Sequence, residues 1–151
     1  MSLNKVEIFK GFIKSANDYH DVVNFLKPLF EKKTCILLVG DLAAGKTTFV
    51  QKFCATYSLQ SVSSPTFSLH QVYSNDQITI DHFDLYRLQT ADEIETSGLW
   101  DVLSKNNALV FIEWSERISA VDLPRDWKIF EISIERLNDE QRCLSIHSLS
   151  Y

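Results

Sequence analysis

Glycine, proline and cysteine are all scarce in this chain of 151 residues, with four, three and three copies. So few glycines and prolines argue against long flexible linkers, and the length predicts one domain over residues 1–151. The three cysteines, Cys35, Cys54 and Cys143, lie far apart and form no C-x-x-C pair. We therefore expect free, buried thiols rather than disulfides or a metal site.

Long apolar runs are also missing. No stretch approaches the ~20 consecutive apolar residues that a membrane-spanning helix needs. The first residues carry no apolar core of the kind found in signal peptides. These absences predict a cytoplasmic protein without a membrane association.

Charge is unevenly spread along the chain, which has a net charge of −5. Residues 1–52 carry +3 and residues 53–151 carry −8. Phosphate neutralisation dominates the affinity of proteins for nucleic acids, so an acidic chain is a poor binder of nucleic acid by itself. The uneven charge indicates an acidic face that meets a partner.

Residues 40–47 match G-x-x-x-x-G-K-[ST], the phosphate-binding P-loop motif. An apolar run at residues 35–39 precedes it and a potential helix at residues 47–57 follows, which is the strand–loop–helix context that a P-loop needs. We expect Lys46 to reach the β- and γ-phosphates of a bound nucleotide and the Thr47 hydroxyl to bind Mg²⁺. The plain alternative is a tight turn between a strand and a helix. The predicted loop comprises Gly40, Asp41, Leu42, Ala43, Ala44, Gly45, Lys46, Thr47 and Thr48.

Ala43 is an unusual residue for this loop, because many P-loops have another glycine there. If the position requires a positive φ, the alanine methyl group costs about 1 kcal/mol of strain.

The remaining pattern predicts an α/β fold. Two capping boxes, at residues 15–18 and 90–93, start helices that we expect to extend over residues 19–30 and to residue 103. Alternation or continuous apolar runs predict strands at residues 6–9, 35–39, 66–73, 77–83, 108–112, 127–134 and 142–147. We expect a P-loop NTPase-like three-layer sandwich with a mixed, largely parallel central sheet, into which residues 66–83 insert a β-hairpin.

Two carboxylates follow predicted strands and are the best candidates to complete a nucleotide site. Glu113 follows the apolar run 109–112 and is ranked first as the Mg²⁺ ligand, because ligands bind at the carboxyl ends of buried strands. Asp84 follows residues 77–83 and could orient the attacking water. The alternatives are a solvent-facing acid at Glu113 and a turn-capping acid at Asp84.

Three further side chains are weaker candidates. Thr66 follows Pro65 and a polar loop, and it could sense the γ-phosphate through Mg²⁺ or simply start a strand. Trp114 is expected at the rim of the site, as a nucleotide contact or a packing aromatic. His82 alternates with Asp81 along a strand, so the two side chains should point to opposite faces and not share a metal.

Four ordered motifs together resemble the TsaE (YjeE) family of small bacterial P-loop ATPases. The P-loop is similar to the family's G-D-L-G-A-G-K-T-T, and residues 64–69 are similar to its S-P-T-[FY]-T-L. Residues 82–88 match H-x-D-L-Y-R-L and residues 112–114 match x-E-W.

This resemblance implies a function that composition does not. Family members bind ATP and Mg²⁺, hydrolyse ATP slowly, and act with TsaD and TsaB to form N6-threonylcarbamoyladenosine at position 37 of tRNAs that read ANN codons. By its motifs, Lys46 and the surrounding loop bind phosphates, and Thr47 and Glu113 are the Mg²⁺ residues. Asp84 and Trp114 are implied to be functional residues. We expect tRNA to be reached only indirectly, through the complex.

Other functions built on a P-loop remain open. A small-molecule or nucleoside kinase could use Asp84 as base and Arg87 as substrate clamp, with a lid in residues 114–126. A GTPase is less well supported, because no N-K-x-D motif follows the apolar strand. The third alternative is a non-catalytic protein whose interaction with partners depends on nucleotide binding. It overlaps the ATPase hypothesis, because slow ATP turnover could reset a complex.

Overall fold

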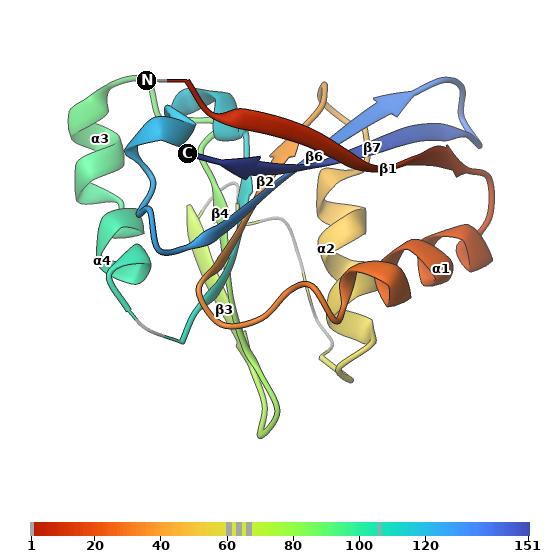
Figure 1. Cartoon of the computed structure of the whole chain (residues 1–151), viewed down its shortest axis with the longest axis horizontal. Helices are drawn as coiled ribbons and strands as arrows, with labels where there is room; N and C mark the ends of the chain where they lie inside the picture. Colours follow the sequence, from red (N-terminus) through yellow and green to blue (C-terminus); the bar gives the residue numbers. More distant parts are fainter. Residues whose placement is uncertain (1, 60–61, 63–64, 66–67, 106) are drawn as a thin grey trace.

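A single sheet organises the computed structural model, which describes residues 2–59, 62, 65, 68–105 and 107–151 (Figure 1). Within these residues, seven strands lie in the order β1-β7-β6-β2-β5-β4-β3. The strands are β1 (Asn4–Ile13), β2 (Thr34–Val39), β3 (His70–Ser74), β4 (Thr79–Asp84), β5 (Leu109–Glu113), β6 (Lys128–Arg136) and β7 (Arg142–Ser150). The helices are α1 (Ala16–Leu26), α2 (Lys46–Ala55), α3 (Ala91–Thr96) and α4 (Leu99–Leu103), with short 3₁₀ helices η1 (Ser115–Arg117) and η2 (Ala120–Asp122).

The centre of the sheet is parallel and both of its sides are antiparallel. Strands β6, β2, β5 and β4 run parallel to one another, whereas β3 pairs with β4, β7 with β6 and β1 with β7 in antiparallel fashion. The predicted hairpin between β3 and β4 is confirmed. The expectation of a largely parallel sheet is right only for its centre. The pairs β3–β4 and β6–β7 are joined by short turns and so can pair only antiparallel, and β1 adds a third antiparallel pair with β7 from far away in the sequence.

Helices cover both faces of the sheet. Along β2, Ile36 and Leu38 pack with residues of α1 and α2, and Cys35 and Leu37 pack with residues of α3 and α4. Figure 1 shows the two helix pairs on opposite sides of the strands. Strand β2 is buried on both faces, as its continuous apolar sequence predicts.

Aromatic side chains fill much of the core between the sheet and α2. Phe53 packs its ring 5.3 Å from that of Phe111 on β5, and Phe30 packs 5.1 Å from Phe130 on β6. Phe49 and Phe53 are fully buried. Each buried side chain of this size contributes about 1.5–3 kcal/mol, so α2 is held firmly against the strands that carry the site.

The two predicted capping boxes are confirmed. Ser15 accepts a hydrogen bond from the Asp18 amide, and the Asp18 carboxylate accepts one from the Ser15 amide at 3.1 Å. Thr90 and Glu93 make the same reciprocal pair at the start of α3. Each box satisfies backbone N–H groups that the first turn of a helix would otherwise leave unpaired.

Several boundaries differ from the predicted ones. The helix expected up to residue 103 is broken into α3 and α4 at Gly98, which has a φ of 87°. Helix α1 ends at Leu26 because Pro28, which lacks an N–H, cannot continue the hydrogen-bond pattern. Strand β3 starts only at His70, since Leu69 before it has a φ of 65°, and part of residues 66–73 lies outside the described structure. Strand β1 extends well beyond residues 6–9, because it pairs with β7 along its whole length.

This topology gathers candidate residues at one edge of the sheet. The carboxyl ends of β2, β5 and β4 lie side by side, because these strands are parallel neighbours. In the described part of the chain, no helix is both long enough and apolar enough to cross a membrane.

Candidate active site

The loop after β2 has the backbone geometry of a tight cradle that opens onto a helix. Gly45 has a φ of 113° and comes directly before Lys46, the first residue of α2. A Cβ at Gly40 would lie 2.6 Å from the Ile134 carbonyl oxygen, so only glycine fits beside β6. Inside the loop, the Ala44 amide donates to the Asp41 carbonyl at 3.0 Å. The N-terminus of α2 therefore faces the space in front of this loop, where its dipole favours anions.

Ala43 does occupy a left-handed conformation, with a φ of 63°. The strain expected for a positive φ at this position is therefore present. The methyl group therefore costs about 1–2 kcal/mol relative to an unstrained backbone, and the loop holds that strain next to the start of α2.

Lys46 lies almost buried at the floor of the loop, with 5% of its surface exposed. Its Nζ donates to the carbonyl of Gly40 and, at 3.3 Å, to that of Asp41. Burial lowers the pKa of the Lys46 ammonium below its ordinary value of 10.5, and Glu113 nearby partly offsets this effect. A poorly solvated cation at this position is well suited to pair with phosphate oxygens.

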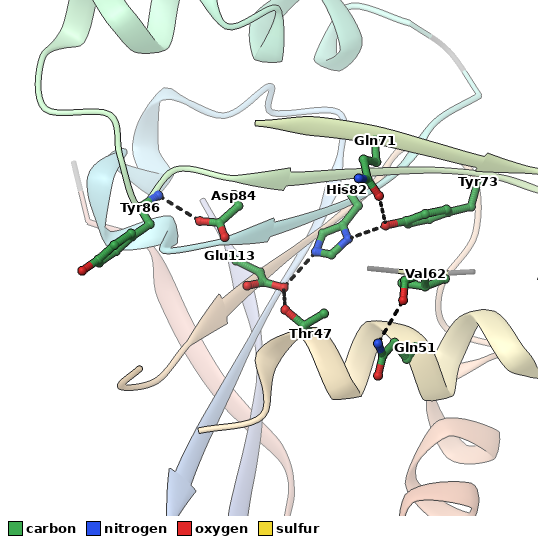
Figure 2. Close-up of polar contacts among 9 residues, drawn as sticks. All are labelled: Thr47, Gln51, Val62, Gln71, Tyr73, His82, Asp84, Tyr86 and Glu113. Atoms are coloured by element: carbon green, nitrogen blue, oxygen red, sulfur yellow. Dashed lines mark hydrogen bonds and ion pairs between the residues drawn. The ribbon is translucent and has the colours of Figure 1, made fainter. Parts of the chain in front are cut away.

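Thr47 and Glu113 meet across the gap between α2 and β5. The Thr47 hydroxyl donates to Glu113 Oε1 at 2.6 Å, and the Glu113 side chain is almost buried (Figure 2). Both groups are hard oxygen donors of the kind that Mg²⁺ selects. The residues present thus fit the divalent cation that the sequence predicted, and the solvent-facing alternative for Glu113 is wrong.

Asp84 stands beside Glu113 at the end of the neighbouring strand. The two residues are register partners in the parallel pair β4 and β5, so their side chains share one face of the sheet. The Asp84 Oδ1 accepts a hydrogen bond from the Tyr86 amide at 2.9 Å, as the turn-capping alternative expected. Asp84 also lines the pocket in front of the loop that precedes α2, and its role toward an attacking water stays a prediction.

Trp114 forms part of the rim of the site, as predicted. Its backbone is left-handed, with a φ of 57°, directly after the end of β5. The ring centroid lies 3.9 Å from Lys46 Nζ and 4.8 Å from the Tyr86 ring. This cation–π contact joins the rim of the site to the cation at its floor.

The pocket that these residues line has a volume of about 430 Å³. Asp84 and Glu113 supply its carboxylates, and Lys46 and Arg142 supply its cations. Gly40 and Asp41 of the predicted loop are not among its lining residues, and they contribute the carbonyls that hold Lys46. The other lining residues are Leu42, Ala43, Ala44, Gly45, Thr47, Thr48, Tyr86 and Trp114.

Thr66, the candidate γ-phosphate sensor, lies outside the described residues. Its role therefore stays a prediction.

Arg142 is a basic residue of the pocket to which the sequence assigned no definite role. It starts β7, and its Nε donates to the Ala44 carbonyl at 2.8 Å, so the C-terminal hairpin braces the P-loop. No local pattern connects residues so far apart in the chain.

The sequence pattern suggests His82 only as a metal ligand, whereas in the structure it is a neighbour of Glu113. Its ring contacts Glu113, whereas Asp81 contacts His70 at 2.7 Å on the other face, so the two side chains diverge as predicted. In the described part of the chain, no group of three or more His, Cys, Asp or Glu side chains is placed to hold a metal. Spacing was the one sequence feature that indicated this contact. Residues 82 and 84 share one face of a strand, so His82 lies on the same face as Asp84, the register partner of Glu113.

Comparison with known proteins agrees with this geometry. The family model described as "Threonylcarbamoyl adenosine biosynthesis protein TsaE" matches residues 13–144. A Rickettsia conorii protein named tRNA threonylcarbamoyladenosine biosynthesis protein TsaE is 36% identical over 138 residues, which cover 89% of this chain and 75% of that protein. A Treponema pallidum protein of the same name is 34% identical over 134 residues, which cover 88% of this chain and 96% of that one.

A solved structure shows the same fold. The crystal structure of Bacillus subtilus YdiB matches with a TM-score of 0.68 and 20% identity over 98% of this chain and 88% of that chain. With the family match and these relatives, the chain belongs to the TsaE family of tRNA threonylcarbamoyladenosine biosynthesis proteins.

Proposed function

We propose that this protein is a P-loop NTPase-like ATPase that binds ATP with Mg²⁺ and hydrolyses it slowly in support of N6-threonylcarbamoyladenosine formation. The observation that carries the proposal is the contact of Thr47 with Glu113 at 2.6 Å, made beside the buried Lys46. A cation and a pair of hard oxygen donors at the start of a helix form a combination suited to a magnesium-bound polyphosphate.

Each side chain has a defined part in this proposal. The loop amides and Lys46 bind the phosphates, and Thr47 and Glu113 hold the Mg²⁺, which would neutralise charge on the β- and γ-phosphates. Asp84 orients the attacking water, and Thr66 senses the γ-phosphate. Phosphoryl transfer to water then depends on positioning and electrostatic stabilisation rather than on covalent catalysis.

The basic side chains around the pocket are few and already engaged, which fits slow ATP hydrolysis. Of the described residues that line it, Lys46 and Arg142 are the basic ones. Arg142 is engaged by backbone carbonyls, including those of Ala44 and Asn138, and so it braces the loop. Arg117 of the expected kinase lid donates to the Tyr86 carbonyl at 3.2 Å and is not among the residues that line the pocket. These contacts favour hydrolysis over the kinase alternative.

The partners proposed are TsaD and TsaB, and tRNA is reached through that complex in the cytoplasm. The names of the relatives connect this family to threonylcarbamoyladenosine on tRNA. A net charge of −5 does not favour a direct grip on tRNA phosphates, so a protein-mediated role is the better fit.

Calorimetric titration with ATP, in Mg²⁺ and in EDTA, tests the proposal. The wild-type protein should bind ATP, and Lys46→Ala should abolish binding and hydrolysis because the phosphates lose their cation. Lys52→Ala is the matched control, since this exposed lysine lies on the same helix. A folded protein that takes up no adenine nucleotide at millimolar concentration, alone or with TsaB and TsaD, would refute the proposal.

A further inference from the structure

A fully buried histidine stands behind the carboxylate that would hold the metal. His82 on β4 has no exposed surface, and its Nε2 lies 2.9 Å from Glu113 Oε1 (Figure 2). The same oxygen accepts the Thr47 hydroxyl. Glu113 Oε1 is thus fixed from two sides, by the helix that follows the P-loop and by the neighbouring strand.

The imidazole is itself fixed from the far side. The Tyr73 hydroxyl of β3 lies 3.1 Å from His82 Nδ1 and also contacts the Gln71 side chain at 2.8 Å. Figure 2 shows these side chains in one row that ends at Thr47. A row of hydrogen bonds therefore leads from the edge strand of the sheet to the first turn of α2.

The Glu113 carboxylate determines which nitrogen of the His82 imidazole carries a proton. An ionised carboxylate only accepts hydrogen bonds, so His82 must present an Nε2–H to Glu113. The Tyr73 hydroxyl has one proton, so beside a neutral ring it donates either to Nδ1 or to Gln71 Oε1 but not to both, whereas beside a charged ring it accepts from Nδ1 and donates to Gln71. His82 is a donor to Glu113 in both cases.

We propose that His82 is a positioning residue that holds the Glu113 carboxylate in the orientation required for Mg²⁺, and that Tyr73 fixes the imidazole for this purpose. The inference rests on the proposed function and names a determinant of metal affinity within that site. Hydrogen-bond partners of metal-binding carboxylates hold the ligand geometry, and their loss typically costs about 10–100-fold in metal affinity or activity. The contrasting possibility is that His82 only satisfies a buried polar group in the core.

A magnesium titration of ATP hydrolysis separates these two roles. At saturating ATP, His82→Leu should raise the half-saturating Mg²⁺ concentration about 10–100-fold, while nucleotide binding measured in EDTA stays near the wild-type value. His82→Gln should recover most of the loss, because its amide can donate from nearly the position of Nε2. Tyr73→Phe, which keeps the ring, should cause a smaller shift in the same direction.

His70 offers a matched control in the same hairpin. Its Nε2 lies 2.7 Å from Asp81, so His70→Leu also breaks a histidine–carboxylate contact, but one away from Glu113. This variant should keep the wild-type Mg²⁺ curve. Melting curves for all variants identify any that fail to fold, and if His82→Leu unfolds, His82→Gln and Tyr73→Phe decide the question.

The outcomes distinguish this inference from the proposed function. A wild-type protein that neither binds nor hydrolyses ATP would refute the function itself. Wild-type activity with an unshifted Mg²⁺ curve in folded His82→Leu would overturn the positioning role alone. Equal shifts in His70→Leu and His82→Leu would also overturn it, because the effect would then be a general consequence of disturbing the hairpin.

Discussion

Thr47 and Glu113 lie 66 residues apart in the chain, and the hydroxyl of the first donates to the carboxylate of the second at 2.6 Å. This contact joins the start of α2 to the end of β5, directly below the P-loop. Its partners come from rigid elements, one a helix packed by aromatic side chains and the other a strand buried along its whole length. Such placement leaves little freedom for the oxygen atoms that the metal would meet.

Removal of the charge on Glu113 should lower the rate of ATP hydrolysis without lowering the stability of the fold. Glu113→Gln keeps the size of the side chain and an oxygen that accepts from Thr47 and His82, but it removes the negative charge. We expect the Mg²⁺-dependent rate to fall at least about 10–100-fold, with a melting temperature no lower than that of the wild type. Steady-state ATPase assays and thermal denaturation measure the two effects.

Asp81→Asn is the control for this variant. Asp81 is equally buried, with 3% of its surface exposed, but it pairs with His70 on the opposite face of β4. It should reduce stability and leave the Mg²⁺ dependence of the rate unchanged. A Glu113→Gln protein with the wild-type Mg²⁺ response would contradict the metal assignment.

The strain at Ala43 predicts a stabilising substitution. Ala43→Gly removes about 1–2 kcal/mol of left-handed strain and adds about 0.5–1 kcal/mol of unfolded-state entropy. The free energy of unfolding should therefore rise, by up to about 1.5 kcal/mol, as measured by urea denaturation.

Gly45→Ala provides the opposite case in the same loop. Gly45 has a φ of 113°, which L side chains rarely adopt, so an added Cβ is strained even though its nearest neighbour, the Tyr19 hydroxyl at 3.5 Å, is at ordinary contact distance. This variant should lose stability. If Ala43→Gly destabilised the protein as much as Gly45→Ala does, the assigned strain at Ala43 would be wrong.

Trp114 should report nucleotide binding by its fluorescence. Its ring lies 3.9 Å from Lys46 Nζ, and phosphate oxygens would compete for that ammonium group. Addition of ATP and Mg²⁺ should therefore change the emission of Trp114. Trp114→Phe should abolish the change although Trp100 and Trp127 remain, and a signal that persists in this variant would mean that another tryptophan reports.

The lowered pKa of Lys46 predicts uptake of protons on nucleotide binding. Burial keeps this pKa below 10.5 in the free protein, and bound phosphates would raise it by favouring the charged ammonium. At alkaline pH, between the free and bound pKa values, the protein should therefore take up protons as the nucleotide binds. Calorimetry in buffers with different ionisation enthalpies measures this exchange.

Lys46→Arg is the control, because arginine stays charged across this range. If the variant still binds ATP, its proton uptake at alkaline pH should vanish. Equal uptake in both proteins would assign the proton to another group.

Local sequence patterns predicted a large part of this structure. The capping boxes, the P-loop and the β3–β4 hairpin each depend on residues within a few positions of one another, so a single sequence displays them. The proximity of Asp84 to Glu113 was also predictable, because each residue ends a strand and parallel strands end at one edge of the sheet. Gly98 could not be predicted as a helix break with the same assurance, since glycine also occurs inside helices.

Contacts that depend on the register between distant strands could not be predicted from the sequence. The His82–Glu113 hydrogen bond requires a particular alignment of β4 on β5, and a slip of one residue would turn His82 to the other face. The Arg142–Ala44 contact spans 98 positions and carries no local signal. The length of β1 likewise depends on β7, with which it pairs.

That last pairing has a consequence for how the protein is made. Residues near opposite ends of the chain, Asn4 and Ser150, are register partners, and β1 has β7 as its neighbour in the sheet. During synthesis on the ribosome, β1 emerges well before β7 and can pair with it only after β7 has emerged. Closing so long a loop is a late and slow step, so β1 should be among the last strands to join the sheet.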